Sequence, residues 1–286
     1  MSAPARTLSL AHLSLVDVPP PRLVEIAAEA GFDAVGLRLW PARDDEARWP
    51  LLGDTAMARE TRALLRATGL GVVDVEVLRL TPTPDLDAYA RVLAAAAELG
   101  ARFAVVSGFD PDEQRLTANY ARLCELAAPL GVRPLLEPMA YSAVCSLAQA
   151  AQIATAAEAA PAPSAPAAPR VGATVGGVLV DAIHLSRTGG TLADVEALDP
   201  RLQGYMQWSD APAALPPGLD AIAAESRTAR LAPGEGALPL LGLLATLPAD
   251  APISVEVPDD AARARLGDLG HARHLQAAAT ALLASR

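Results

Sequence analysis

Residues 103–138 read FAVVSGFDPDEQRLTANYARLCELAAPLGVRPLLEP and contain one complete unit of a repeating pattern. The apolar run 103–108 leads to a stretch of helical composition over 112–130, which Gly131 closes before a second apolar run at 132–138. Short apolar runs without alternation are typical of strands buried on both faces of a parallel sheet. Glycine directly after a periodic stretch is a common helix end. This stretch therefore predicts a strand, a helix and a second, parallel strand.

The same pattern continues along the chain, with each unit taking about 30 to 40 residues. The predicted strands are residues 8–13, 34–39, 72–78, 103–108, 132–138, 177–183, 204–210 and 253–258. Eight such units predict an α/β fold, a single (β/α)8 TIM barrel spanning residues 1–286. A doubly wound open sheet is the alternative, but its first strand–helix turn is usually rich in glycine, and here it is DVPPPR (17–22). A Pro/Ala-rich segment at 161–170 lies inside the repeat pattern and is predicted to be a loop.

Composition excludes several classes of function. All 23 basic residues are arginine, so a Schiff-base lysine and a phosphate-binding loop of the P-loop type are excluded. The formal net charge of −10 disfavours nucleic-acid binding. The N-terminal stretch is too weakly apolar for a secretory signal, and no apolar run reaches the ~18 residues of a membrane span, so we expect a cytoplasmic protein. Cys124 and Cys145 lack CxxC spacing and are expected to be buried structural thiols.

Polar residues terminate the predicted strands, where the chemistry of a barrel collects. These residues are His12, Arg38, Glu76, Ser107, Glu137, Asp181, Gln207 and Glu256. An isolated acidic residue at a strand end is often a helix cap, which is the alternative for Asp181. Several carboxylates on neighbouring strand ends repel one another unless a cation neutralises them. We therefore predict that Glu137, Asp181, Gln207 and Glu256 bind a divalent metal, Mn²⁺ or Mg²⁺ first and Co²⁺ or Zn²⁺ as alternatives.

Three short motifs give the chain a resemblance to a known family. Asp181 and His184 form a D-x-x-H element, GFDAVGLRLWP spans 31–41, and RLAPGEG spans 230–236. In their order and spacing these motifs resemble the xylose isomerase-like TIM barrels of the sugar phosphate isomerase/epimerase superfamily, over nearly the whole chain. The ketose 3-epimerases of that superfamily carry Glu, Asp, His and Glu on their last four strands. This chain departs from that set at the third position, where Gln207 replaces the histidine. Enzymes similar to the 3-dehydroshikimate dehydratases also carry glutamine there. The alternative is that the site has lost its metal.

The resemblance implies a metal-dependent isomerase or epimerase of carbohydrate metabolism, acting on a small polyhydroxy ketone or keto acid through an enediolate. Glu137 and Glu256 would be the base and the acid on opposite faces of the substrate. His184 would hydrogen-bond a substrate hydroxyl or assist proton transfer, with orientation of a carboxylate as the alternative. A dehydratase at the same site is the second hypothesis, weakened because E-P-M-A (137–140) lacks the histidine common in those enzymes. A catalytically silent small-molecule binder is the third.

Other polar residues are predicted to line the substrate pocket. The predicted substrate-binding residues are His12, Arg38, Glu76, Arg227 and Arg230, and Trp40 and Arg79 are further pocket candidates. The guanidinium groups of Arg227 and Arg230 are suited to a carboxylate or phosphate, with an exposed helix surface as the alternative. The expected partner is a small molecule, without nucleic acid or membrane. The resemblance is compatible with a homodimer or homotetramer.

Overall fold

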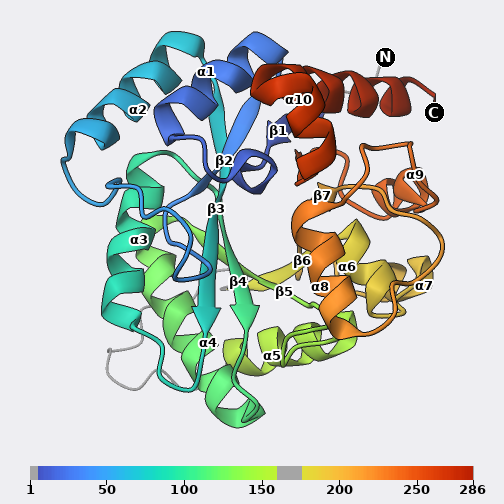
Figure 1. Cartoon of the computed structure of the whole chain (residues 1–286). Helices are drawn as coiled ribbons and strands as arrows, with labels where there is room; N and C mark the ends of the chain where they lie inside the picture. The colour runs from blue at the N-terminus through green and yellow to red at the C-terminus, as the bar shows by residue number, and fades with distance from the viewer. Residues whose placement is uncertain (1–5, 160–175, 286) are drawn as a thin grey trace.

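The eight strands form one closed, parallel barrel in sequence order, which confirms the predicted fold class (Figure 1). The computed structural model describes residues 6–159 and 176–285, and the predicted loop at 161–170 lies outside them. The strands are β1 (Leu8–Leu10), β2 (Ala34–Arg38), β3 (Gly71–Leu80), β4 (Phe103–Gly108), β5 (Arg133–Glu137), β6 (Gly177–Asp181), β7 (Gln203–Trp208) and β8 (Ile253–Val255).

Helices follow the strands and surround the barrel (Figure 1). They are α1 (Pro20–Ala30), α2 (Ala56–Thr68), α3 (Leu86–Glu98), α4 (Glu113–Ala127), α5 (Leu147–Ala159), α6 (Ala182–Arg187), α7 (Leu192–Glu196), α8 (Leu219–Thr228), α9 (Leu240–Ala245) and α10 (Asp260–Ala284), with 3₁₀ turns η1 (His12–Leu15) and η2 (Ala128–Leu130). Helix α10 packs against α1, so the last helix completes the ring beside the first.

Local sequence signals set the helix ends. Asp112 precedes α4, and its side chain accepts a hydrogen bond from the Arg115 backbone N–H, as expected of an N-cap. Gly31 ends α1 with a φ of 88°, a conformation that glycine adopts without steric cost. These caps fix where each helix starts and stops, and thereby hold the strand ends in place.

Apolar side chains fill the barrel interior below its C-terminal mouth. Phe103, Leu135, Leu179 and Tyr205 belong to one buried cluster, and the rings of Phe103 and Tyr205 lie 5.1 Å apart between centroids. Such a packed interior leaves the C-terminal strand ends as the place where polar side chains meet in a cavity.

The elements differ from the sequence prediction in several places, among them β3, which extends to Leu80, and β8, which ends at Val255 and not at residue 258. The first strand is shorter than predicted, because η1 begins at His12. The sixth strand ends at Asp181, because α6 begins directly after it, and neither α6 nor α8 was predicted. Cys124 is buried as expected, whereas Cys145 is exposed, which corrects the prediction of two buried thiols.

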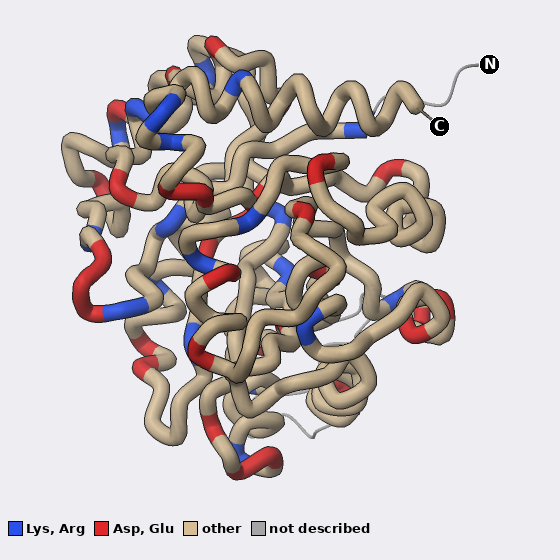
Figure 2. The backbone as a smooth tube through the Cα atoms, turned by 45° about the vertical axis from the view of Figure 1, so that its right-hand side comes forward, with Lys and Arg blue, Asp and Glu red and all other residues tan. Residues whose placement is uncertain are grey.

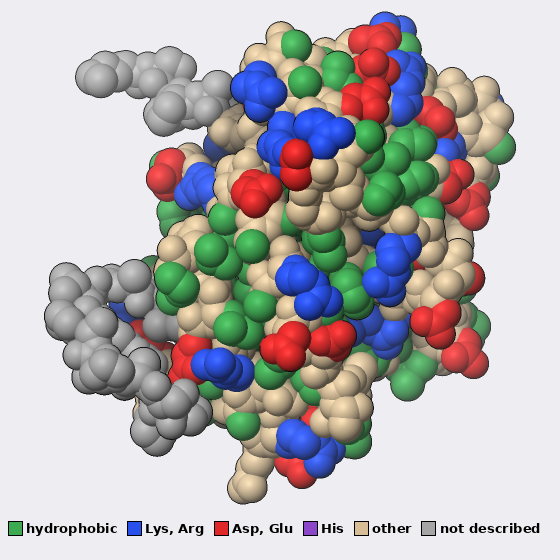
Figure 3. Space-filling view, turned by 90° about the vertical axis from the view of Figure 1, so that its left-hand side faces the viewer, with side chains coloured by type: hydrophobic (Ala, Val, Ile, Leu, Met, Phe, Trp, Pro, Cys, Tyr) green, Lys and Arg blue, Asp and Glu red, His purple; other side chains and the backbone are tan. Residues whose placement is uncertain are grey.

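Charges of both signs are interspersed over the outside of the barrel. Figure 2 shows acidic and basic residues scattered over the chain, including several around the centre of the view. The face in Figure 3 likewise mixes arginine, acidic and apolar side chains instead of presenting one basic patch. Within the described ranges, no helix has both the length and the apolar character needed to cross a membrane.

Candidate active site

A cavity of about 460 Å³ opens at the C-terminal ends of the strands. Several polar residues line its wall. They are Arg38 at the end of β2, Glu76 within β3, Glu137 at the end of β5, His184 in α6 and Glu256 directly after β8. The structure therefore brings together polar residues that are up to about two hundred positions apart in the sequence, as the barrel topology requires.

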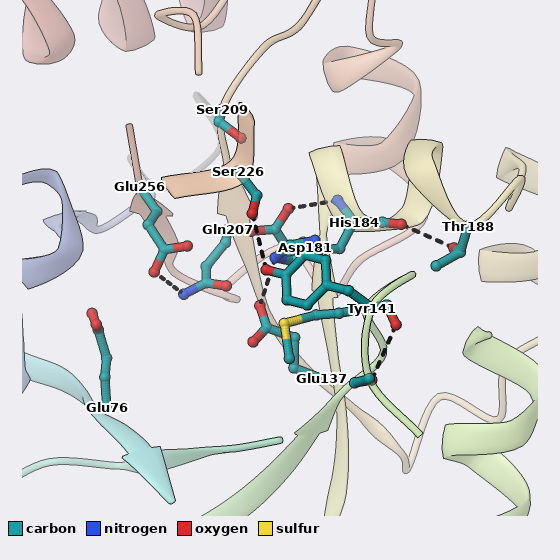
Figure 4. Close-up of polar contacts among 12 residues, drawn as sticks. Glu76, Glu137, Tyr141, Asp181, His184, Thr188, Gln207, Ser209, Ser226 and Glu256 are labelled. Atoms are coloured by element: carbon teal, nitrogen blue, oxygen red, sulfur yellow. Dashed lines mark hydrogen bonds and ion pairs between the residues drawn. The ribbon is translucent and has the colours of Figure 1, made fainter. Parts of the chain in front are cut away.

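Glu137, Asp181 and His184 form a cluster of potential metal donors. Each offers one ligand atom, and the three atoms lie within 4.8 Å of one another; all three side chains are buried (Figure 4). The Nε2 atom of His184 lies 3.9 Å from Oε1 of Glu137. Two carboxylates and an imidazole are a donor set that suits a borderline divalent cation. His184 was predicted to contact the substrate, and it lines the cavity; its ring is in addition placed where it could bind a metal.

The spacing of the D-x-x-H element has a local structural cause. Asp181 is the N-cap of α6, and its Oδ1 accepts a hydrogen bond of 3.0 Å from the backbone N–H of His184. Capping links residues three apart, so the same bond that starts the helix also places the imidazole beside the carboxylate. Asp181 is thus both a helix cap and a potential ligand, and the two alternatives considered for it are compatible.

Arg230 is fully buried between two of the predicted ligands. Its Nη1 atom donates to Oδ2 of Asp181 over 2.8 Å, and its Nη2 atom lies 3.0 Å from Oε2 of Glu256. Its Nε atom donates to the backbone carbonyl of Ser226 over 2.7 Å. The guanidinium group, predicted to bind substrate, is therefore engaged with carboxylates of the site itself while still reaching the cavity wall.

Gln207 and Glu256 contact each other beside this cluster. The amide Nε2 of Gln207 donates to Oε1 of Glu256 over 2.8 Å (Figure 4). The amide oxygen of Gln207 is buried without a hydrogen-bond partner among the described residues. A buried oxygen in that state is costly unless something occupies its lone pairs. This orphaned oxygen fits the predicted role of Gln207 as a neutral metal ligand.

Burial and neighbouring charges shift the acidity of the site. Burial, followed by the charges of Glu256 and Asp181, raises the pKa of Glu137 well above its ordinary value. Burial also raises the pKa of Glu256 to about 8, against the pull of Arg230. For Asp181, burial acts upward, but the charge of Arg230 and the neighbouring His184 bring its pKa below the ordinary value. Such crowded carboxyl groups are stabilised by a proton or by a cation.

Burial favours the neutral form of the His184 imidazole. Burial lowers its pKa to about 4, although the charge of Asp181 acts in the opposite direction. Its Nδ1 atom is buried and forms no hydrogen bond within the described chain. A neutral imidazole with an unpartnered ring nitrogen retains a lone pair for a metal or a proton acceptor role.

Most of the remaining predicted residues line the cavity, whereas His12 is bonded to the backbone and supports the fold. Glu76 lines the cavity opposite the donor cluster, pairs with Arg38 at 3.1 Å, and has a pKa raised to about 7, mainly by burial. Arg227 is exposed at the rim. His12 is buried with both ring nitrogens engaged: Nε2 contacts the carbonyl of Val18 at 2.9 Å, and Nδ1 accepts from the backbone N–H of Arg38. His12 therefore supports the end of β2 and has no free ring nitrogen for a substrate.

Tyr141 is a cavity residue that the sequence did not indicate. Its ring lies edge-on to His184, with 5.7 Å between centroids, and its hydroxyl lies 2.9 Å from that of Ser226 (Figure 4). Ser226 belongs to the unpredicted α8, so no signal along the chain linked the two. Tyr141 limits the positions that the His184 ring can take.

Asp210 holds the RLAPGEG segment against the barrel. Its carboxylate accepts hydrogen bonds from the backbone N–H groups of Ala211, Gly234 and Leu238 at 2.9 to 3.0 Å. A Cβ on Gly236 would lie 2.3 Å from this carboxylate, so only glycine fits. This anchoring fixes the segment that begins with Arg230.

Comparison with known proteins places this geometry in context. The model of the family described as xylose isomerase-like TIM barrel matches residues 24–281. No curated protein sequence matches the chain. The chain is similar in structure to the IolI protein with a bound zinc atom, with a TM-score of 0.75, 15% identity and 98% of both chains covered. It is also similar in structure to a longer xylose isomerase-like TIM barrel/4-hydroxyphenylpyruvate dioxygenase fusion protein, with a TM-score of 0.71 and 23% identity. That match covers 95% of this chain and 42% of the fusion protein.

Two further solved structures share the fold. One is the 3-keto-D-glucoside 4-epimerase YcjR from E. coli, with a TM-score of 0.69, 16% identity, and coverage of 98% of this chain and all of that one. The other is the probable 3-DHS dehydratase AsbF from Bacillus anthracis, with a TM-score of 0.69, 13% identity, and coverage of 96% and 98%. At these identities the likeness establishes the fold alone.

Proposed function

The chain belongs to the xylose isomerase-like TIM barrel family, and on that premise we propose that it is a divalent-metal-dependent isomerase or epimerase of a small polyhydroxy ketone or keto acid. One observation carries the proposal: ligand atoms of Glu137, Asp181 and His184 converge within 4.8 Å of one another, and Glu137 and His184 line the cavity. Buried carboxylates gather in this way where a cation or a proton offsets their repulsion.

The donors around the cluster define what would hold the metal. Glu137, Asp181 and His184 would bind it, and the unpartnered amide oxygen of Gln207, with Glu256 beside it, would complete the site. Three carboxylates, the Arg230 guanidinium and one divalent ion sum to zero formal charge. The metal would polarise the substrate carbonyl and so acidify the adjacent C–H bond. Because the proposed ligands include the imidazole of His184, Co²⁺ and Zn²⁺ become suitable ions beside Mn²⁺ and Mg²⁺.

Glu137 and Glu256 are the proposed acid and base. They come from β5 and from the residue after β8, and both line the cavity. One carboxylate would remove the proton from the carbon beside the carbonyl, and the other carboxyl group would return a proton to the enediolate. The pKa of Glu256 is raised to about 8 and that of Glu137 is raised above its ordinary value, in both cases mainly by burial, and a raised pKa favours the protonated form that a general acid requires.

Dehydration at the same site is the second candidate function. The observation that favours it is Gln207, which stands where the epimerases have histidine, together with the fold shared with a probable 3-DHS dehydratase. In that reaction the same enolate would expel a β-hydroxyl group, with His184 as the candidate acid. A conjugated enone absorbing in the ultraviolet would form only in this case.

Solvent deuterium exchange tests the proposal. We expect the Mn²⁺-loaded protein to incorporate deuterium beside the carbonyl of at least one ketose in a panel of ketohexoses and keto acids, observed by NMR. Glu137→Gln and Glu256→Gln should each abolish incorporation, whereas Glu125→Gln on α4, which does not line the cavity, should not change it. Metal analysis of the purified protein completes the test. A protein that binds no divalent ion and exchanges no proton would instead be a silent binder, and the proposal would be rejected.

The biological setting is part of the same proposal. We propose a cytoplasmic protein whose partner is a small molecule and whose subunits form a homodimer or homotetramer. Sedimentation of the metal-loaded chain would give the subunit number, and a monomer at micromolar concentration would contradict the last point.

A further inference from the structure

Six arginines line the cavity, and two of them lack an acidic partner. The four paired ones are Arg38 with Glu76, Arg43 with Asp45, Arg230 with Asp181, and Arg263 with Asp17. Arg79 and Arg227 form no ion pair within the described ranges, although both border the same cavity. In an acidic protein with ten more negative than positive charges, a cation left unpaired at a cavity wall is conspicuous.

Aromatic rings hold both guanidinium groups in place. The Arg79 guanidinium carbon lies 4.0 Å from the ring centroid of Phe109, and one of its nitrogens donates to the carbonyl of Ala42 over 2.7 Å. The Arg227 guanidinium carbon lies 5.0 Å from the ring centroid of Tyr141. Stacking on a ring fixes the plane of a guanidinium and leaves its N–H edge free for hydrogen bonds.

The two rings also bring the arginines to one side of the cavity. Phe109 directly follows β4, and Tyr141 follows β5, which pairs with β4 along its length. Arg79 comes from the last residues of β3 and Arg227 from the end of α8. Side chains from two distant segments thus reach the rim above neighbouring strands.

An acidic residue that Arg227 influences is already engaged with another arginine. Asp45 is close enough to Arg227 to have its pKa lowered slightly by it, but Arg43 is the main cause. Two nitrogens of Arg43 donate to the two oxygens of Asp45, over 2.8 and 3.0 Å. The Asp45 carboxylate therefore leaves the N–H groups of Arg227 available to a ligand.

We propose that Arg79 and Arg227 bind an anionic group, a carboxylate or a phosphate, at the end of the substrate remote from the reacting carbonyl. The proposal rests on the proposed function for the position of that carbonyl. Glu137, Asp181 and Glu256 repel an anion from the donor cluster, so the negative end of a substrate is directed to the rim. Planar paired N–H groups of arginine match both oxyanions.

Three ketoses that differ only at carbon 6 provide the probes. D-Fructose ends there in a hydroxymethyl group, D-fructuronate in a carboxylate and D-fructose 6-phosphate in a phosphate. Binding is measured by calorimetry with Mn²⁺ present and in Glu256→Gln, which keeps the cluster of Glu137, Asp181 and His184, so that turnover does not interfere and failure of the proposed chemistry leaves the affinities readable. We expect at least one anion to bind about tenfold or more tightly than D-fructose. The better of the two anions identifies the group.

Substitution of the arginines gives the second arm. Arg227→Met and Arg79→Met should each reduce the preference for the anion about tenfold, while the affinity for D-fructose is retained. Arg122→Met, at an exposed arginine of α4, is the matched control and should change neither affinity. Arg227 is exposed, and its guanidinium group forms no hydrogen bond to the described part of the chain, so its variant should remain folded even if Arg79→Met does not. Absence of any anion preference when both arginines are present, or its full retention after Arg227→Met, overturns the proposal.

Discussion

Arg230 donates to the Asp181 carboxylate over 2.8 Å, in a pair that is closed off from solvent. Because the same guanidinium group also lies 3.0 Å from Glu256, one fixed cation is shared by carboxylates from β6 and from the end of β8. A buried cation of this kind lowers the repulsion that a metal alone would otherwise have to offset. It therefore contributes to stability before any metal binds.

Removing this cation should destabilise the metal-free protein. Arg230→Met leaves Asp181 and Glu256 buried without their shared donor, and breaking a buried pair from one side costs about 3 to 5 kcal/mol. Urea unfolding in the presence of a chelator measures the loss. Arg122→Met, which removes an exposed ion pair, should cost less than about 1 kcal/mol. Equal losses in the two variants would contradict a structural role for Arg230.

Replacing Asp181 should separate its role as a cap from its role as a ligand. Asn is also a good N-cap, so Asp181→Asn should keep the start of α6 while removing the charge that faces Arg230 and the metal. We expect the affinity for Mn²⁺ to fall by roughly tenfold or more, measured by competition with a chelator. Asp181→Ala loses the cap as well and should cost about 1 kcal/mol more in stability.

A second helix cap provides the control for this comparison. Asp112 caps α4 in the same way, away from the cavity. Asp112→Ala should reduce stability by about 1 kcal/mol and leave the Mn²⁺ affinity unchanged. Loss of metal binding in this variant would mean that the effect at Asp181 is a general consequence of destabilisation.

The strand ends were accessible to sequence reasoning because they follow a simple rule. An apolar run that ends in a carboxylate places that carboxylate at the mouth of a barrel, and this is where Glu137, Asp181 and Glu256 lie. The partner of Asp181 was not accessible in this way. Arg230 is 49 residues away and follows a helix with weak local signals, so only the packed barrel shows that the two meet.

Buried carboxyl groups with raised pKa values should lower the stability of the metal-free protein as the pH rises through about 7 to 8, above the range in which the lowered pKa values of His12 and His184 act in the opposite direction. Asp74 lies buried in the barrel interior, where burial raises its pKa to about 7 from an ordinary 3.8. A carboxyl group with a raised pKa contributes stability below its unfolded pKa, and this contribution is lost as the pH passes through the folded value. Glu76 and Glu256, with pKa values raised to about 7 and about 8, act in the same direction.

Asp74→Asn isolates one part of this dependence. The amide cannot ionise, so the fall in unfolding free energy between pH 5 and pH 8 should be smaller by an amount on the order of 2 to 4 kcal/mol. Gly36 on β2 makes room for the side chain, since a Cβ there would lie 2.6 Å from the Asp74 carboxylate, and Asn has nearly the same size. Urea unfolding with chelator at both pH values decides the question. An unchanged slope would show that Asp74 stays ionised in the folded protein.

Tyr141 and His12 show two further limits of prediction from sequence. Tyr141 lies in a loop with no periodic pattern, so nothing marked it as a neighbour of His184. His12 ends an apolar run as an active-site residue would, yet the chain turns into η1 there and both ring nitrogens bond to the backbone. A polar residue after a strand is informative only when the following backbone leaves its side chain free.

Substitution at Gln207 should tune the metal preference and test its predicted role. Gln207→His provides an imidazole nitrogen in place of an amide oxygen and should shift the preference towards Zn²⁺ and Co²⁺ relative to Mn²⁺ and Mg²⁺. Gln207→Leu removes the oxygen donor and also the N–H group that binds Oε1 of Glu256, so we expect Mn²⁺ affinity to fall about tenfold or more. Gln203→Leu, on the same strand four residues nearer the N-terminal end of the barrel, is the control and should leave the affinity unchanged. If Gln207→Leu binds Mn²⁺ as tightly as the unsubstituted protein, the metal is held by Glu137, Asp181 and His184 without the amide, and the unpartnered oxygen of Gln207 faces water or substrate.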